Sequence, residues 1–203
     1  MTAAVPPALK RFIWDIQSMV ELTEDAREIL LIGADLMSRL IATDDWLPEP
    51  FAAPAAAGPR QFQLFGDAAQ RFCVVSTVLA PGQSLPLLQE PYWQIMGVLR
   101  GTVALEKVRV SSGAAARAEG TSRMIGRGAV ERLRAVPQEA MLLFNPSDAE
   151  AAIVIQVYGG EIGTRPRHVV TPDGTLEPCA FDYANGPETP AYDIWSIQTK
   201  IED

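Results

Sequence analysis

The sequence has very little histidine and cysteine, the side chains that most often bind transition metals. Its 203 residues contain one histidine, His168, and two cysteines, Cys73 and Cys179. A single chain therefore cannot form a three-histidine metal site, a four-cysteine zinc site or a zinc motif with two histidines. Two distant cysteines give no disulfide framework, and free thiols suit a reducing cytoplasm, although one disulfide stays an open alternative.

A surplus of basic residues and long apolar runs are missing as well. The chain has 17 Lys and Arg against 25 Asp and Glu, a net charge of −8, so nothing is left over to neutralise nucleic-acid phosphates. No run of about 18 apolar residues occurs, and the N-terminus lacks the charged start, apolar run and cleavage site of a signal peptide. We expect a cytoplasmic protein that binds neither nucleic acid nor membranes.

The first fifty residues predict two helices. Pro6 and Pro7 open a helix expected over residues 8–22, where apolar residues fall near helical spacing. Thr23 is the expected N-cap of a second helix, which should end near Thr43.

From Arg60 onward, short β-branched segments predict strands. The expected strands cover residues 72–79, 93–98, 102–110 and 151–158. Turn residues separate them, and the chain has 16 prolines and 15 glycines, which argues for an all-β sandwich or barrel. Residues 111–121 are expected to form an exposed loop.

With 48% hydrophobic and 21% charged residues, the chain suits one globular domain. We divide it into a helical region, 1–46, packed on a β-barrel domain, 60–203, with a proline- and alanine-rich connector, 47–59.

Residues 81–101 contain a recognisable pattern, which begins Pro81-Gly82-Gln83, passes through Trp93 and closes with Gly97-Val98-Leu99-Arg100-Gly101. Further matching segments follow at 144–148 (FNPSD), 153–159 (IVIQVYG) and 167–172 (RHVVTP). Together they resemble the cupin motifs of the cysteine dioxygenase type I family, over about residues 60–185. The resemblance implies a mainly β protein, a cupin double-stranded β-helix (a jelly-roll barrel) with N-terminal α-helices outside.

The iron ligands of that family are absent. The resemblance implies three ligand histidines at positions that are Leu88, Glu90 and Met141 here. One carboxylate does not make a tight iron site, and methionine is well suited to fill an irregular gap. We therefore expect Leu88 and Met141 to be core residues and predict no cofactor, with iron entering only under the enzyme alternative below.

Other positions that support the site in that family have also changed. A Ser-x-His-x-Tyr run reads Val154-x-Gln156-x-Tyr158 here. The arginine that binds the substrate carboxylate aligns loosely with Gln61, and related mercaptopropionate enzymes have glutamine there too.

Strand alternation places a set of side chains in the barrel interior. If the strand is regular, Leu88, Glu90, Tyr92 and Gln94 share one face, as do Val154, Gln156 and Tyr158. The candidate pocket residues are Gln61, Leu88, Glu90, Tyr92, Gln94, Met141, Gln156 and Tyr158. A buried Glu90 needs a partner, for which Gln156 and Tyr158 are candidates.

These residues could bind a polar ligand, or form a polar network that satisfies itself, or leave Glu90 turned to the barrel mouth. We favour the last two interpretations, in which no ligand is bound. Among the remaining residues, we expect His168 to lie at the surface or form a hydrogen bond, and Cys73 to be inert core. We expect Arg165 and Arg167 to be solvated; the alternative is that they receive a carboxylate at the mouth.

Three hypotheses for function follow. The first is a non-catalytic cupin, related to thiol dioxygenases, that has lost iron and binds a small polar molecule or a protein partner. The second is an enzyme, either an oxygenase with an unusual metal site at Glu90 or a metal-free catalyst using Glu90 and Tyr158. The third is a structural or interaction role, such as pairing with an active homologue through the outer sheet. A homo-oligomer is a further alternative. The missing histidines favour the first.

Overall fold

Two helices precede a pair of facing β-sheets in the computed structural model of the chain. The structure describes residues 4–110, 117–118, 122–164, 167–179 and 182–194. The helices are α1 (Pro7–Leu22) and α2 (Ala26–Leu40), and a short 3-10 turn, η1 (Glu49–Phe51), follows in the predicted connector. Neither of these two helices has the combined length and apolar character needed to cross a bilayer.

The start of α2 differs from the prediction, because Asp25 and not Thr23 is its N-cap. The Asp25 carboxylate accepts a hydrogen bond from the Arg27 N–H at 2.8 Å, and a negative charge is favourable at this end of a helix. Thr23 supports the cap instead, since its hydroxyl oxygen accepts the Asp25 N–H at 3.1 Å. The helix also ends at Leu40, earlier than the predicted Thr43.

All strand pairings in the two sheets are antiparallel. The five-stranded sheet has the order β1 (Arg60–Gly66), β2 (Cys73–Leu79), β10 (Ala152–Tyr158), β4 (Gln94–Arg100), β8 (Val130–Leu133). The second sheet has the order β12 (Leu176–Cys179), β11 (Arg167–Val170), β3 (Leu88–Gln89), β9 (Glu139–Phe144), β5 (Thr102–Arg109), β6 (Arg117–Ala118), and β7 (Arg123–Gly126) also pairs with β5.

The order of pairing identifies the fold. Within the first sheet, β2, β10, β4 and β8 are neighbours, and within the second, β3, β9, β5 and β7 are neighbours. Apart from the β5–β7 hairpin, each of these strands is followed in the chain by one in the opposite sheet. This winding of eight strands into two facing four-stranded sheets is the jelly roll. The predicted fold, a mainly β cupin double-stranded β-helix with N-terminal helices, is confirmed.

The four predicted strands are all present, as β2, β4, β5 and β10, within two residues of the expected bounds. Gly101 forms the tight turn between β4 and β5 with a φ of 72°, a conformation that glycine adopts without strain. The predicted loop over 111–121 lies outside the described residues, except for the backbone of β6. The boundaries drawn between the regions 1–46, 47–59 and 60–203 stay a prediction.

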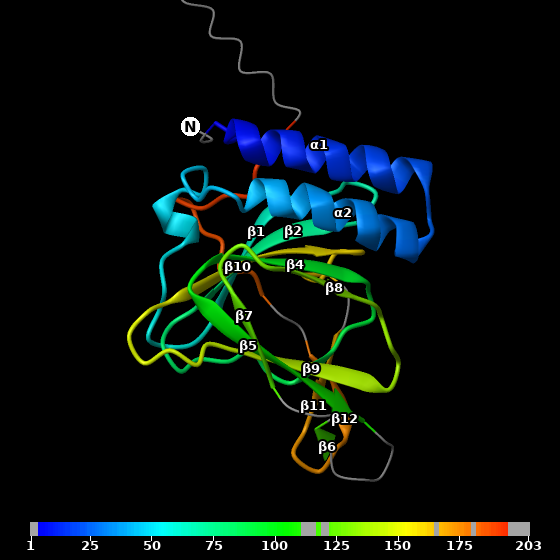
Figure 1. The fold of residues 1–203 in the computed structure, drawn as a ribbon, viewed down its shortest axis with the longest axis vertical. Coiled ribbons are helices and arrows are strands. Elements are labelled where there is room, and N and C mark those ends of the chain that lie inside the picture. The colour runs from blue at the N-terminus through cyan, green and yellow to red at the C-terminus, as the bar shows by residue number, and fades with distance from the viewer. Residues whose placement is uncertain (1–3, 111–116, 119–121, 165–166, 180–181, 195–203) are drawn as a thin grey trace, which may run out of the picture.

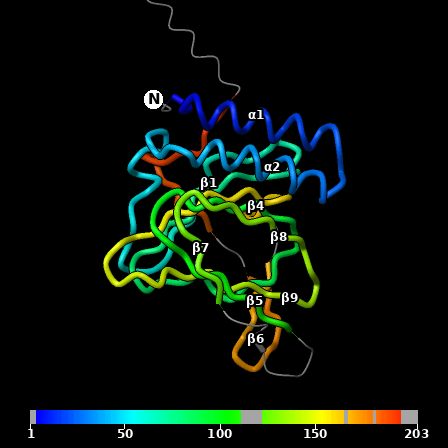
Figure 2. The backbone as a smooth tube through the Cα atoms, viewed as in Figure 1, coloured from blue at the N-terminus to red at the C-terminus, as the bar shows by residue number. Residues whose placement is uncertain are grey.

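Both helices lie over the outer face of the five-stranded sheet (Figures 1 and 2), where α2 packs against β4 and β8. Gly33 permits this close approach, because a Cβ atom there would lie 2.3 Å from Ile95 Cδ1 of β4. Strands β5 and β9 lie in the opposite sheet, away from the helices (Figure 2). The helices therefore cover one sheet and leave the barrel interior to the two sheets.

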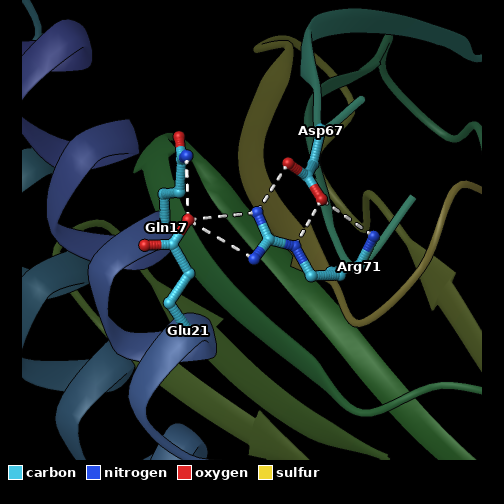
Figure 3. Close-up of polar contacts among 4 residues, drawn as sticks. All are labelled: Gln17, Glu21, Asp67 and Arg71. Atoms are coloured by element: carbon cyan, nitrogen blue, oxygen red, sulfur yellow. Dashed lines mark hydrogen bonds and ion pairs between the residues drawn. The ribbon is translucent and has the colours of Figure 1, made fainter. Parts of the chain in front are cut away.

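Arg71, in the loop between β1 and β2, ties this loop to α1 (Figure 3). Its Nε atom lies 2.7 Å from Asp67 Oδ2, and its two terminal nitrogens lie 3.4 Å from Glu21 Oε1. Gln17 also donates to Glu21, at 3.1 Å. The hydrogen bond from the Arg71 side chain lowers the pKa of Asp67, so this carboxylate stays charged to lower pH than an ordinary aspartate.

The five-stranded sheet is buried on both faces, and the two faces belong to different cores. On β10, Ile155 and Val157 pack into the cluster that includes the helices, whereas Val154 packs into a cluster between the two sheets. Gln156 and Tyr158 lie on the same face as Val154. Polar side chains thus enter the barrel interior from a strand whose other face is apolar.

Candidate functional site

The pairing of β11 with β3 brings Arg167 to the barrel interior. His168 is paired with Gln89 and Val169 with Leu88, so the same antiparallel register places Arg167 opposite Glu90. Glu90 follows the last residue of β3, at the start of the connection to β4. Two side chains that lie 77 positions apart in the sequence therefore become cross-strand neighbours.

Arg167 and Glu90 form a buried, two-pronged ion pair. Arg167 Nε donates to Glu90 Oε2 at 3.1 Å, and Nη2 donates to Glu90 Oε1. The Arg167 side chain has 0% of its surface exposed and that of Glu90 only 5%. A bidentate pair satisfies both charges where water is excluded, so that neither is left as an isolated buried ion.

The guanidinium of Arg167 also lies close to Gln61 and Tyr158. Its Nη1 atom lies 3.4 Å from Gln61 Oε1, and its Cζ atom lies 5.5 Å from the centroid of the Tyr158 ring. Burial opposes the charge of Arg167, but the interactions with Tyr158 and Glu90 outweigh this effect and raise its pKa further. Arg167 is therefore a permanent cation inside the barrel.

Hydrogen bonds continue from this pair across the five-stranded sheet. Gln61 Nε2 donates to Thr77 Oγ1 at 3.0 Å, and the Thr77 hydroxyl donates to Gln156 Oε1. All three side chains are buried, and they come from the neighbouring strands β1, β2 and β10. The interior is thus occupied by a connected polar network that joins the two sheets.

Beside this network lies a cavity of about 20 Å³. Its lining consists of Leu85, Pro86, Leu88, Glu90, Gln94, Met96, Leu105, Met141, Leu143, Gln156 and Tyr158. A space of this size holds roughly one water molecule. The Tyr158 hydroxyl is buried without a hydrogen-bond partner among the described residues, and burial raises the pKa of Tyr158.

Six of the eight candidate pocket residues line this cavity: Leu88, Glu90, Gln94, Met141, Gln156 and Tyr158. Gln61 is not among the lining residues but forms hydrogen bonds with Arg167 and Thr77. Tyr92 packs instead against a separate cluster around Cys73, and its ring lies against Gly160. The stretch that contains these residues is also not one regular strand, because β3 ends at Gln89 and β4 begins at Gln94 in the other sheet. Whether any of these residues binds a ligand stays a prediction.

Two expectations about charged residues were wrong. Arg167 was expected to be solvated and is fully buried, and the partner of Glu90 is Arg167 rather than Gln156 or Tyr158. The reason is that the partner comes from a four-residue strand far along the chain, whose register no local pattern reveals. Arg165 lies outside the described residues.

Cys73 contributes no reactive group to this site. Burial, together with the negative charge of Glu161, raises the pKa of Cys73 to about 12, as expected of an inert core thiol. The Tyr183 hydroxyl donates to Glu161 and contacts Cys73 Sγ at 3.6 Å. Cys73 and Cys179 are both free, so the alternative of a disulfide is not realised.

The side chains present do not fit a metal ion. Leu88 and Met141 face each other directly in the register of β3 and β9, and Leu88 has no donor atom. Glu90 has one carboxylate, and Arg167 already holds both of its oxygens. Within the described parts of the chain, no group of three or more His, Cys, Asp or Glu side chains is placed to hold an ion. The iron that the resemblance implies therefore has no adequate ligand set among the described side chains.

The chain matches no protein-family model. Among solved structures, it is similar to an uncharacterised protein with a double-stranded β-helix domain from Klebsiella pneumoniae, at 17% identity and a TM-score of 0.45, over 60% of this chain and 86% of that one. An RmlC-like cupin from Methanocaldococcus jannaschii matches at 12% identity and a TM-score of 0.41, over 53% and 85% of the two chains. An oxalate oxidase bound to the substrate analogue glycolate matches at 18% identity and a TM-score of 0.41, over 54% and 55%. The fold assignment rests on the strand pairing given above, and these similarities assign no role to any residue.

Proposed function

We propose that this chain is a cysteine dioxygenase-like cupin that has lost the three-histidine iron site and acts as a non-catalytic binding protein. The observation that carries the proposal is the ion pair of Arg167 and Glu90. Glu90, the carboxylate of this pair, lines the same small cavity as Leu88 and Met141, the other two positions where the resemblance puts iron ligands. A carboxylate held on both oxygens and two side chains without nitrogen or oxygen donors make a poor ligand set for iron, which supports the proposal.

The alternative is an enzyme, either an oxidoreductase with an unusual metal site or a metal-free catalyst using Glu90 and Tyr158. Both groups would have to exchange protons with, or bind to, a molecule in the cavity. Glu90 is bound on both oxygens by Arg167, and burial raises the pKa of Tyr158 far above neutrality. Neither state suits an acid–base catalyst, which supports the non-catalytic proposal over this alternative.

The size of the interior bears on what the protein binds. Pockets for small molecules have volumes of about 300–1,000 Å³, and the barrel cavity has about 20 Å³. Of the two ligands suggested by the sequence, a small polar molecule or a protein partner, we favour the partner. It would bind on the outer surface, either as another protein or as a second copy of this chain.

Thiol-dependent oxygen uptake tests the proposal. The untagged protein is incubated with Fe²⁺ under anaerobic conditions and then given dioxygen with cysteine, cysteamine or 3-mercaptopropionate. We expect no uptake above that of a heat-unfolded sample carrying the same iron. Sustained uptake, with formation of the corresponding sulfinic acid by the folded protein alone, would overturn the proposal in favour of the oxidoreductase.

A further inference from the structure

Arg167 differs from every other described cation of this protein in its surroundings. Among the described residues, it is the one positively charged side chain that is buried. Three of the groups around it present electron density to a cation: the carboxylate of Glu90, the amide oxygen of Gln61 and the face of the Tyr158 ring. This environment would suit a positive charge of any kind.

We infer that the guanidinium of Arg167 takes the cation position of this barrel and excludes a divalent metal from it. The inference rests on the proposed function, because it explains how a cupin interior that has lost its iron ligands continues to exclude metal ions. It goes further in assigning Arg167 a direct competition with metal ions for Glu90, beyond the loss of the histidine ligands. On this account Arg167 is a competitor of any metal for the Glu90 carboxylate.

The geometry supports a direct competition. Leu88 and Met141 are register partners, and both line the same small cavity as Glu90 and Tyr158. A metal ion held between residues 88, 90 and 141 would need an oxygen of Glu90, and Arg167 binds both of them. In addition, a doubly charged ion next to a buried guanidinium is repelled strongly, because little water is present to screen the charges.

Arg167 should also limit metal binding by variants in which histidines are added. Leu88→His together with Met141→His would add two imidazoles and complete a set of two histidines and one carboxylate, which suits several divalent metals. If Arg167 competes for Glu90, this double variant still binds metal poorly. Removing Arg167 as well frees the carboxylate, and metal binding becomes tight.

Cobalt binding provides the test, with Co²⁺ as a spectroscopic probe of the ligand set. Three purified variants are titrated by calorimetry and visible absorption: L88H/M141H, L88H/M141H/R167M and L88H/M141H/R100M. The last is the matched control, because Arg100 is a partly exposed arginine paired with Asp44 on the outside of the barrel. We expect the R167M variant to bind one Co²⁺ on the order of 100-fold more tightly than the other two.

Equal affinities in the three variants would overturn the competition. A folded L88H/M141H/R167M variant that binds no cobalt would overturn the position assigned to the cation. If that variant does not fold, R167Q replaces R167M. The L88H/M141H variant gives a separate test, because it retains Arg167. Tight cobalt binding by this variant contradicts the inference, and weak binding by the folded variant supports it. None of these results depends on thiol oxidation by the unmodified protein, so failure of the inference and failure of the proposed function are distinguishable.

Discussion

The two faces of the five-stranded sheet are equally buried but chemically different. On the outer face, Ile153, Ile155 and Val157 of β10 pack against a layer that includes the two helices. On the inner face, the Tyr158 ring of the same strand lies against the buried guanidinium of Arg167, and Gln156 accepts a hydrogen bond from Thr77. An apolar face is sufficient to hold a sheet in place, whereas buried polar groups cost stability unless they are paired. The inner face is thus mixed: apolar side chains such as Val154 pack there beside a hydrogen-bonded network of buried polar groups.

The largest effect is expected from separating the ion pair. Arg167→Met leaves the Glu90 carboxylate buried alone, and Glu90→Gln leaves the guanidinium alone. Each should lower the free energy of unfolding by about 3–5 kcal/mol, measured by urea denaturation at pH 7. The double variant Glu90→Gln/Arg167→Met should recover much of the loss, because no unpaired charge remains. Two independent, additive losses would show that the side chains do not interact.

The next prediction compares the loss of unfolding free energy for a substitution on the inner face with that for a substitution on the outer face. Thr77→Val keeps the shape of the side chain but removes the hydroxyl that links Gln61 to Gln156, and should cost about 1–3 kcal/mol. Ile155→Val on the outer face removes one methylene group and should cost about 0.5–1.5 kcal/mol. The same denaturation experiment compares them. A smaller loss for Thr77→Val than for Ile155→Val would mean that the polar network adds no stability.

A third effect concerns the ion pair of Arg71 and Asp67 in the loop between β1 and β2. Arg71 lowers the pKa of Asp67, so the pair stabilises the protein fully above the ordinary aspartate pKa of about 4 and loses this contribution as the pH falls through the lowered value. Asp67→Asn should cost about 1 kcal/mol at pH 7. Its stability should then decline less than that of the unmodified protein between about pH 5 and pH 2. Parallel pH profiles from thermal unfolding would refute this role.

The smallest effect is expected at Tyr158, where the hydroxyl has no partner among the described residues. Tyr158→Phe should change the free energy of unfolding by less than about 0.5 kcal/mol or raise it slightly, because no hydrogen bond is lost. Gln156→Leu, in which the acceptor of the Thr77 hydroxyl is lost, is the contrasting variant and should be clearly destabilised. A loss above about 1.5 kcal/mol for Tyr158→Phe would indicate a hydrogen bond to a water molecule in the adjacent cavity.

The sequence predicted the elements with strong local patterns. The runs rich in β-branched residues became β2 and β10, and the apolar spacing before residue 41 became α1 and α2. Alternation placed Gln156 and Tyr158 beside one cavity, and Glu90 and Gln94 also line it although they do not share one regular strand. Strand β3 has only two residues and β11 only four, too few for a periodic pattern. The partner of Glu90 depends on the register between these two short strands, and register is set by the assembled barrel rather than by neighbours in the sequence.

The metal content of the purified protein tests the central claim most directly. The unmodified chain, without an affinity tag, is produced in medium supplemented with iron, and its metal content is measured by elemental mass spectrometry. If Arg167 holds Glu90 as the structure has it, each transition metal should be present at less than about a tenth of an equivalent, because no sufficient ligand set remains. Near one equivalent of iron, retained through dialysis, would contradict the account and require that Glu90 bind metal instead of Arg167.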